Sequence, residues 1–246
     1  MLIRRSLATR WDGRELMDDP DSDFELLRRT VRQFRLINRL LSRSRSLLRR
    51  WVLRDLGDTR ECRVLELGGG DGELARWLYR AIARRGGAPE VESMDQDDRA
   101  LRLAREADDG TPISLLRGRA PEELPEGPFE YVFGNLFIHH LSNTELVELL
   151  GELRHRGTKR CIFNDLYRGY LPLAAYSVFA GVFLRRSFAY YDGRASIRRG
   201  FRPAELETIA REAGWDRIRV FRRFPGHLVV VLDRNEAGTT ARDCVP

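Results

Sequence analysis

Apolar residues recur along the chain at two different spacings, and the change of spacing marks the predicted elements. Between Phe24 and Leu56 the apolar positions follow steps of three and four residues, which predicts two amphipathic helices. From about residue 60 to 165, strand-like runs alternate with helical segments, for example RVLEL, ELARWLYRAIARR, EVESMD, DDRALRLAREA, ISLLRG and FEYVFGNLF. This alternation predicts βαβ units and a parallel sheet.

The second half of the chain departs from this alternation. Residues 143–155 predict a helix, and CIFNDL after them predicts a buried central strand. The stretch LPLAAYSVFAGVF at 171–183 is too apolar for a solvated loop and too short to cross a membrane, so we expect a helix buried against the fold. PAELETIAREAGW predicts a helix that ends at Gly214, and RIRVFRRF and HLVVVLD predict a closing pair of strands.

Composition narrows the class of protein. A chain of 246 residues with 42% hydrophobic and 33% charged residues is expected to form one large α/β domain. The N-terminus lacks the apolar core of a secretory signal and no stretch has the length of a membrane span, which favours the cytoplasm. Cys62, Cys161 and Cys244 lie far apart without ligand spacing, so neither a disulfide framework nor a metal site is expected.

The charge of the chain has two interpretations. A net charge of +6 could attract an anionic partner. The basic residues alternate with acidic ones, however, which is typical of solvated helix faces. We therefore expect no nucleic-acid partner.

The segment VLELGGGDGEL places four glycines around one aspartate directly after a predicted strand. A phosphate-binding P-loop requires a lysine and a serine or threonine after its last glycine, and neither is present. A dinucleotide fingerprint starting at Gly68 would require a small residue at position 73, where Glu73 would repel a pyrophosphate. A ligand without phosphate is therefore favoured.

The same segment, as E-x-G-x-G-x-G at Glu66, Gly68, Gly70 and Gly72, resembles motif I of the class I S-adenosylmethionine-dependent methyltransferases. The acidic surroundings suit a cofactor that carries a sulfonium and an amino group. The resemblance covers roughly residues 60 to 165. It implies a Rossmann-like, mostly parallel seven-stranded sheet with helices on both faces.

Further residues extend the resemblance. Asp95 ends a predicted strand, where the family has a carboxylate for the ribose hydroxyls, although it could instead cap the next helix. FEYVFGNLFIHHLS resembles the fourth-strand region of small-molecule methyltransferases. Where the family usually has an acidic residue for the adenine amino group, the chain has Arg119, so a nearby backbone carbonyl replaces it or adenine recognition is weakened. The residues expected at the cofactor are Glu66, Gly68, Gly70, Asp71, Gly72, Asp95, Gln96, Arg119, Ala120 and Asn135.

Three residues are candidates for catalysis. His139 and His140 could supply a general base for a hydroxyl acceptor, or could cap a helix or pack on the cofactor. Asp165, at the carboxyl end of the predicted fifth strand, could act as a base, cap the following turn or pair with Arg168. For the acceptor itself we expect contacts from Tyr190, Tyr191 and Arg168, although two adjacent tyrosines are also typical of packing.

These observations predict three regions: an N-terminal helical cap at 1–58, a cofactor-binding domain at 59–234 with an apolar lid at about 168–200, and a flexible tail at 235–246. The predicted function is transfer of a methyl group from S-adenosylmethionine to a small, largely apolar acceptor, most simply a phenolic oxygen. RELMDDPD together with NDLYRG is similar to segments of bacterial methyltransferases of polyketide or quinone-like phenols. Two alternatives stay open: a noncatalytic protein of this fold and an RNA methyltransferase. A homodimer is a further possibility for the cap.

Overall fold

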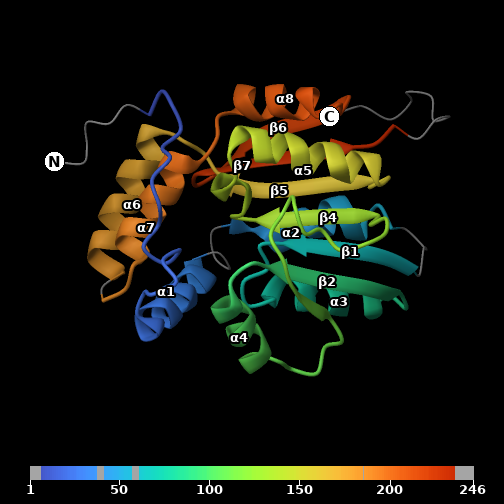
Figure 1. The fold of residues 1–246 in the computed structure, drawn as a ribbon, viewed down its shortest axis with the longest axis horizontal. Coiled ribbons are helices and arrows are strands. Elements are labelled where there is room, and N and C mark those ends of the chain that lie inside the picture. The colour runs from blue at the N-terminus through green and yellow to red at the C-terminus, as the bar shows by residue number, and fades with distance from the viewer. Residues whose placement is uncertain (1–6, 38–41, 57–60, 185, 236–246) are drawn as a thin grey trace.

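The computed structural model of the protein describes residues 7–37, 42–56, 61–184 and 186–235. At its centre a seven-stranded sheet runs in the order β3-β2-β1-β4-β5-β7-β6 (Figure 1). Its strands are β1 Glu61–Leu67, β2 Ala88–Asp95, β3 Ser114–Arg117, β4 Tyr131–Asn135, β5 Arg160–Leu166, β6 Arg217–Arg223 and β7 His227–Asp233. The parallel sheet and the closing strand pair expected from the sequence are confirmed.

Strand direction determines where a ligand can bind. The first five strands are parallel to one another, and β7 runs antiparallel to both β5 and β6. The chain proceeds outwards from β1 to β2 and β3, then returns to β4 on the other side of β1. Ligands of open α/β sheets bind at such a reversal, outside the carboxyl ends of the strands. The segments that follow β1 and β4 therefore meet at the expected crevice.

Helices cover both faces of the sheet. Helix α5 Asn143–His155 and helix α8 Pro203–Glu212 pack on one face, where their leucine and isoleucine side chains join one core cluster. On the other face, α2 Ser44–Leu48, the π-helix η2 Arg49–Leu53 and α3 Glu73–Ala83 form a second cluster. Helix α4 Asp98–Glu106 follows β2. The short 3-10 helix η3 Ile138–His140 follows β4.

The N-terminal residues predicted as one cap lie in two places. Helix α2 and η2 belong to the core of the sheet, whereas α1 Phe24–Ile37 lies against α7 Ala189–Arg199. Figure 1 shows α1, α6 and α7 gathered beyond one end of the sheet. We call residues 7–37 together with α6 and α7 the cap layer.

The helix predicted at 171–183 is present as α6 Tyr170–Phe183, but the expectation that it buries itself is wrong. Ala180 is its one fully buried residue, and the side of α6 that faces away from α7 is open to solvent. Helix α7 was not predicted. No described helix is long and apolar enough to span a membrane. Cys62 and Cys161 are buried free thiols, and Cys244 and residues 236–246 lie outside the described residues.

Candidate functional site

The glycine turn between β1 and α3 adopts a backbone that side chains rarely allow. Gly68, Gly70 and Gly72 have φ angles of 66°, 56° and 69°. A Cβ on Gly68 would lie 2.6 Å from Cδ2 of Phe137, so this glycine allows the loop after β4 to close on the turn. A Cβ on Gly70 would meet no atom within 4 Å. Gly70 therefore leaves open space at the reversal point, where a ligand can approach the backbone.

Carboxylates surround this turn. Oδ2 of Asp95 accepts a hydrogen bond from the Gly70 N–H at 2.9 Å, and Oδ1 accepts one from the Asp97 N–H at 2.9 Å. Asp97 is the N-cap of α4, since its side chain accepts from the Arg99 N–H at 2.8 Å. The capping role considered for Asp95 thus belongs to Asp97. Burial raises the pKa of Asp95.

Glu66 lies beneath the turn. It is 3% exposed, and its Oε2 accepts a hydrogen bond from Ser93 Oγ at 2.8 Å. Burial raises the pKa of Glu66 to about 8. A Cβ on Gly69 would lie 1.9 Å from Oγ of Ser93 and 3.2 Å from Oε2 of Glu66, so a side chain at position 69 would meet this pair.

The turn and Asp95 together fit the expected cofactor. The space at Gly70 lies next to a carboxylate at the end of β2, where ribose hydroxyls can donate to its remaining lone pairs. Asp71 belongs to the same turn, and its Oδ1 accepts from the Glu73 N–H at 3.2 Å. Gln96 is exposed beside Asp95. A positively charged sulfonium suits this acidic setting better than a pyrophosphate does.

Arg119 is paired with acidic residues. Its Nη2 donates to Glu145 Oε1 at 2.9 Å, at the start of α5, and its N–H donates to Glu123 Oε2 at 2.9 Å. The carbonyl of Arg119 accepts from the Glu123 N–H at 2.7 Å, and Ala120 is buried. The carbonyl considered as a substitute adenine acceptor thus already serves the local turn.

Asn135 ends β4 in a polar cluster. Its Oδ1 accepts hydrogen bonds from Ser44 Oγ at 2.5 Å and from Asn164 Nδ2 at 2.9 Å. A cavity of about 10 Å³ lies among these residues, which is roughly the space of one water molecule. These contacts connect Asn135 to α2 and β5. Ser44 was not identified as a residue of this cluster from the sequence, because it is distant from Asn135 along the chain.

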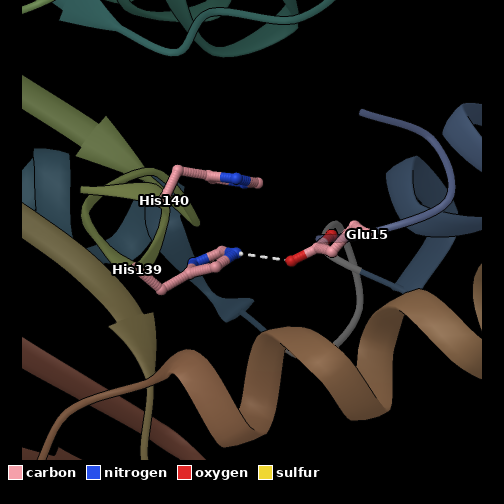
Figure 2. Close-up of side chains that lie close together, drawn as sticks. All are labelled: Glu15, His139 and His140. Carbon is pink, nitrogen blue, oxygen red and sulfur yellow. Dashed lines mark ion pairs between the residues drawn. The ribbon is translucent and has the colours of Figure 1, made fainter. Parts of the chain in front are cut away.

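His139 is buried between two carboxylates from distant parts of the chain. Its Nδ1 lies 2.7 Å from Oδ1 of Asp165, and its backbone N–H donates to Oδ2 of Asp165 at 3.0 Å. Its Nε2 lies 3.5 Å from Oε1 of Glu15, which comes from the cap layer (Figure 2). All three side chains are at most 3% exposed. The structure thus pairs Asp165 with His139, and not with Arg168.

The electrostatics of this trio favour a charged histidine. Burial alone would lower the pKa of His139, but Asp165 and Glu15 raise it to about 9. Burial alone would raise the pKa of Glu15, but its contact with His139 and the charges of His139 and His140 lower it to about 2. The pKa of Asp165 is likewise lowered: burial alone would raise it, but His139 outweighs that effect. At neutral pH the trio therefore carries one positive and two negative charges.

His140 has a different environment. Its side chain is 30% exposed, its ring centroid lies 4.2 Å from that of His139, and its Nδ1 lies 3.8 Å from Oδ2 of Asp18. Burial and the charge of His139 lower the pKa of His140 to about 3. His140 is therefore neutral at neutral pH and, unlike His139, partly open to solvent.

Two arginines bind the carbonyl oxygens of His139, His140 and Leu141, a segment that we call the histidine loop. Arg10 Nη2 donates to the carbonyls of His139 at 3.1 Å and Leu141 at 2.9 Å. Arg199 donates to the His139 carbonyl from Nε at 3.1 Å and to the His140 carbonyl from Nη2 at 3.0 Å. Neither Arg10 nor Glu15 was identified from the sequence, because the polar segment that contains them has no periodic pattern.

Glu15, His139 and His140 could also ligate a metal ion. One ligand atom from each lies within 4.8 Å of the others. Asp165 contacts Nδ1 of His139, as carboxylates that orient a metal-binding histidine do in zinc sites. A metal at Nε2 would have to replace the proton that the two carboxylates stabilise. Proton and metal therefore compete for this site.

The residues predicted to contact the acceptor are placed elsewhere. Arg168 is fully buried, and all five of its N–H groups have acceptors: the carbonyls of Leu7, Ala8 and Gly200 and the two carboxylate oxygens of Glu205. These contacts use every N–H group of Arg168, so they argue against its predicted contact with the acceptor, which stays a prediction.

Tyr190 and Tyr191 are 41% and 37% exposed on α7. The hydroxyl of Tyr190 accepts from Arg194 Nη1 at 3.1 Å, and its ring lies near Gly181 of α6. These contacts favour packing of Tyr190 on the α6–α7 pair, and the predicted contact with the acceptor stays a prediction.

Comparisons with known proteins agree with this geometry. Residues 64–157 match the family model of the methyltransferase domain. None of the curated protein sequences matches the chain. The plantazolicin methyltransferase BpumL in complex with SAH aligns over 90% of this chain and 95% of its own, with a TM-score of 0.63 and 13% identity.

Two further solved structures share the fold. The apo form of the S-adenosylmethionine-dependent methyltransferase SibL aligns over 92% of this chain and 64% of its own, with a TM-score of 0.60 and 19% identity. Magnesium protoporphyrin IX methyltransferase from Synechocystis PCC 6803 with bound SAH aligns over 79% and 83%, with a TM-score of 0.54 and 17% identity. At these identities the likeness shows the fold alone.

Proposed function

We propose that this chain, which is a class I S-adenosylmethionine-dependent methyltransferase, methylates a small and largely apolar acceptor at a phenolic oxygen. The observation that carries the proposal is the contact of Glu15 with His139 beneath the cap layer, at the carboxyl ends of β4 and β5. An acceptor that reaches this position must fit under residues of the chain's own N-terminal segment.

The cofactor supplies a methyl group on a positively charged sulfur, so that displacement at carbon requires positioning of the acceptor more than activation of it. The turn at Gly70 and the carboxylate of Asp95 would hold the cofactor. The histidine loop follows β4, the neighbour of β1 in the sheet. The acceptor oxygen would therefore lie between the glycine turn and this loop.

His140 is the residue that we propose to take the proton. His139 is charged at neutral pH and directs its Nε2 at Glu15, whereas His140 is neutral and partly exposed. The cofactor, when bound, would supply the methyl group and leave as S-adenosylhomocysteine, and the methylated hydroxyl oxygen would be positive and strongly acidic. A base with a pKa of about 3 is then sufficient, and Asp18, at 3.8 Å, stabilises the charge that His140 gains.

The test is turnover with a set of phenolic acceptors of increasing apolar size, in which S-adenosylhomocysteine is measured by mass spectrometry. We expect the wild type to produce S-adenosylhomocysteine and a methyl ether. His140→Gln is expected to lower kcat with little change in cofactor affinity. His155→Gln, on the last turn of α5, is the matched control.

Three outcomes separate the possibilities. Binding of the cofactor without turnover of any acceptor would favour the noncatalytic alternative, for which Arg119 in place of an acidic residue is the specific observation. An unchanged kcat in His140→Gln would exclude His140 as the proton acceptor while leaving methyl transfer intact. Phenols that react only on carbon or nitrogen would overturn the O-methylation. We propose the cytoplasm as the site of the reaction and secondary metabolism as its context.

A further inference from the structure

The outer face of α6 is the most unusual surface of the described residues. The helix has no charged residue, and a helix that is apolar all round is ordinarily buried. Here one side packs on α7, where Tyr176 Oη donates to the Ala189 carbonyl at 2.6 Å. The other side is exposed: Leu171 by 81%, Val178 by 70% and Phe183 by 68%.

The apolar surface continues past the start of α6. Phe224, in the turn between β6 and β7, is 88% exposed. The neighbouring Gly226 lies against Pro172, since a Cβ on this glycine would be 3.1 Å from Cβ of Pro172. We call Tyr170, Leu171, Val178, Val182, Phe183 and Phe224 the apolar edge. In Figure 1, α6 forms the margin of the molecule at the cap layer.

Arginines border the apolar edge. At the end of α6, Arg29 Nη1 donates to the carbonyl of Arg186, which brings these two exposed arginines together. At its start, exposed Arg222 stacks over Tyr167, with Cζ 4.1 Å from the ring centroid. Between residues 168 and 202 the sequence has one acidic residue, Asp192.

Asp192 does not reduce this positive charge at the surface. Its side chain is fully buried, and its two carboxylate oxygens accept from the backbone N–H groups of Leu16 at 2.7 Å and Met17 at 3.1 Å. Asp192 therefore adds no negative charge to the solvent side of the apolar edge.

The positive charge of the bordering arginines distinguishes two possible partners of the apolar edge, a second copy of the chain and an anionic lipid layer. A second copy of the chain would join through a two-fold axis and place the apolar edge against itself, which would bring arginine against arginine. An anionic lipid headgroup layer instead complements the arginines while its acyl region accepts the apolar side chains. From this complementarity we infer that the apolar edge docks on the surface of an anionic lipid bilayer, with α6 lying in the plane of the interface.

This docking is independent of methyl transfer, because the apolar edge shares no residue with the glycine turn or the histidine loop. It can be tested by co-sedimentation of the full chain with vesicles of phosphatidylcholine alone or mixed with phosphatidylglycerol. We expect binding to the mixed vesicles, little binding to phosphatidylcholine alone, and weaker binding as salt is raised.

Variants test whether the apolar edge is responsible. The triple variant Leu171→Ser, Val182→Ser, Phe224→Ser is expected to lose at least about tenfold in vesicle affinity. Arg222→Ser should weaken binding to the anionic vesicles, whereas the matched change Arg105→Ser, on the exposed side of α4, should not. Thermal unfolding and cofactor binding of each variant establish that the fold is retained.

Two results would overturn the proposal. One is equal vesicle binding of the wild type and the triple variant. The other is a wild type that ignores anionic vesicles but forms a dimer by light scattering, with the triple variant a monomer. That second result would assign the apolar edge to a second copy of the chain.

Discussion

Replacement of Glu15 by Gln tests the electrostatics of the buried histidine. The change keeps the size and the Oε1 acceptor for Ser196 Oγ but removes one negative charge beside His139. Two unit charges 3.5 Å apart attract by about 1 kcal/mol in water and by about 5 kcal/mol at an effective dielectric constant of about 20. Since a pKa unit corresponds to about 1.4 kcal/mol, the pKa of His139 should fall from about 9 by roughly 1 to 3.5 units.

The assay is a histidine titration by NMR on the chain labelled at its four histidines. Glu25→Gln makes the same chemical change on the exposed surface of α1 and should leave the His139 titration unmoved. A His139 pKa that is the same in Glu15→Gln and in the wild type would refute the ion pair. It would also refute the contact between the N-terminal segment and the histidine loop.

The ion pair of His139 and Glu15 makes the free energy of unfolding depend on pH in two ranges. The pKa of His139 is raised, so its contribution is fully present below about 6.5 and is lost as the pH rises through about 9. The pKa of Glu15 is lowered, so its contribution is fully present above about 4.5 and is lost as the pH falls through about 2. Unfolding of Glu15→Gln should therefore show a weaker decline in stability at alkaline pH than unfolding of the wild type.

Three further substitutions test other parts of the site. Asp95→Ala should weaken binding of S-adenosylhomocysteine by about 1 to 3 kcal/mol in calorimetry, and an unchanged affinity would remove Asp95 from the cofactor site. Gly68→Ala should lower the free energy of unfolding in urea more than Gly70→Ala. Both glycines have a positive φ, but only the methyl group added at position 68 meets Phe137. Equal losses of unfolding free energy in the two variants would contradict this. Arg168→Met should cost about 3 to 5 kcal/mol of unfolding free energy because it leaves buried carbonyls without donors, and a loss below about 1 kcal/mol would contradict the buried network.

The sheet and the glycine turn could be predicted because their signals are local. The helix at 143–155 was predicted at the bounds that the structure shows, since its apolar positions lie within the segment itself. The turn at Gly68–Gly72 could be identified for the same reason. A ligand that must approach the backbone leaves glycines at fixed spacing in the sequence.

The residues that complete the histidine site could not be predicted in this way. Glu15 reaches His139 across more than a hundred residues, and a polar N-terminal segment has no periodicity that would place it there. Helix α7 begins among aromatic residues and contains Asp192 and Gly193, which are typical of turns. In the structure Asp192 instead accepts hydrogen bonds from the backbone N–H groups of Leu16 and Met17, a tertiary contact that composition does not reveal.

The exposed face of α6 shows a different limit. An apolar segment predicts burial, and the inner side of α6 follows that rule through Tyr176 and Ala180. The number of apolar residues in a helix does not predict how many of its faces pack against other parts of the same chain. The outer side of α6 has no packing partner among the described residues, so its apolar side chains are free to contact a lipid surface.

The central claim is that the turn at Gly68–Gly72 with Asp95 receives a sulfonium nucleoside and not a dinucleotide. Calorimetric titration of the wild type with S-adenosylhomocysteine, and separately with NAD, tests it most directly. The structure predicts binding of one S-adenosylhomocysteine per chain and no heat with NAD. Saturable binding of NAD, or no binding of S-adenosylhomocysteine, would contradict it.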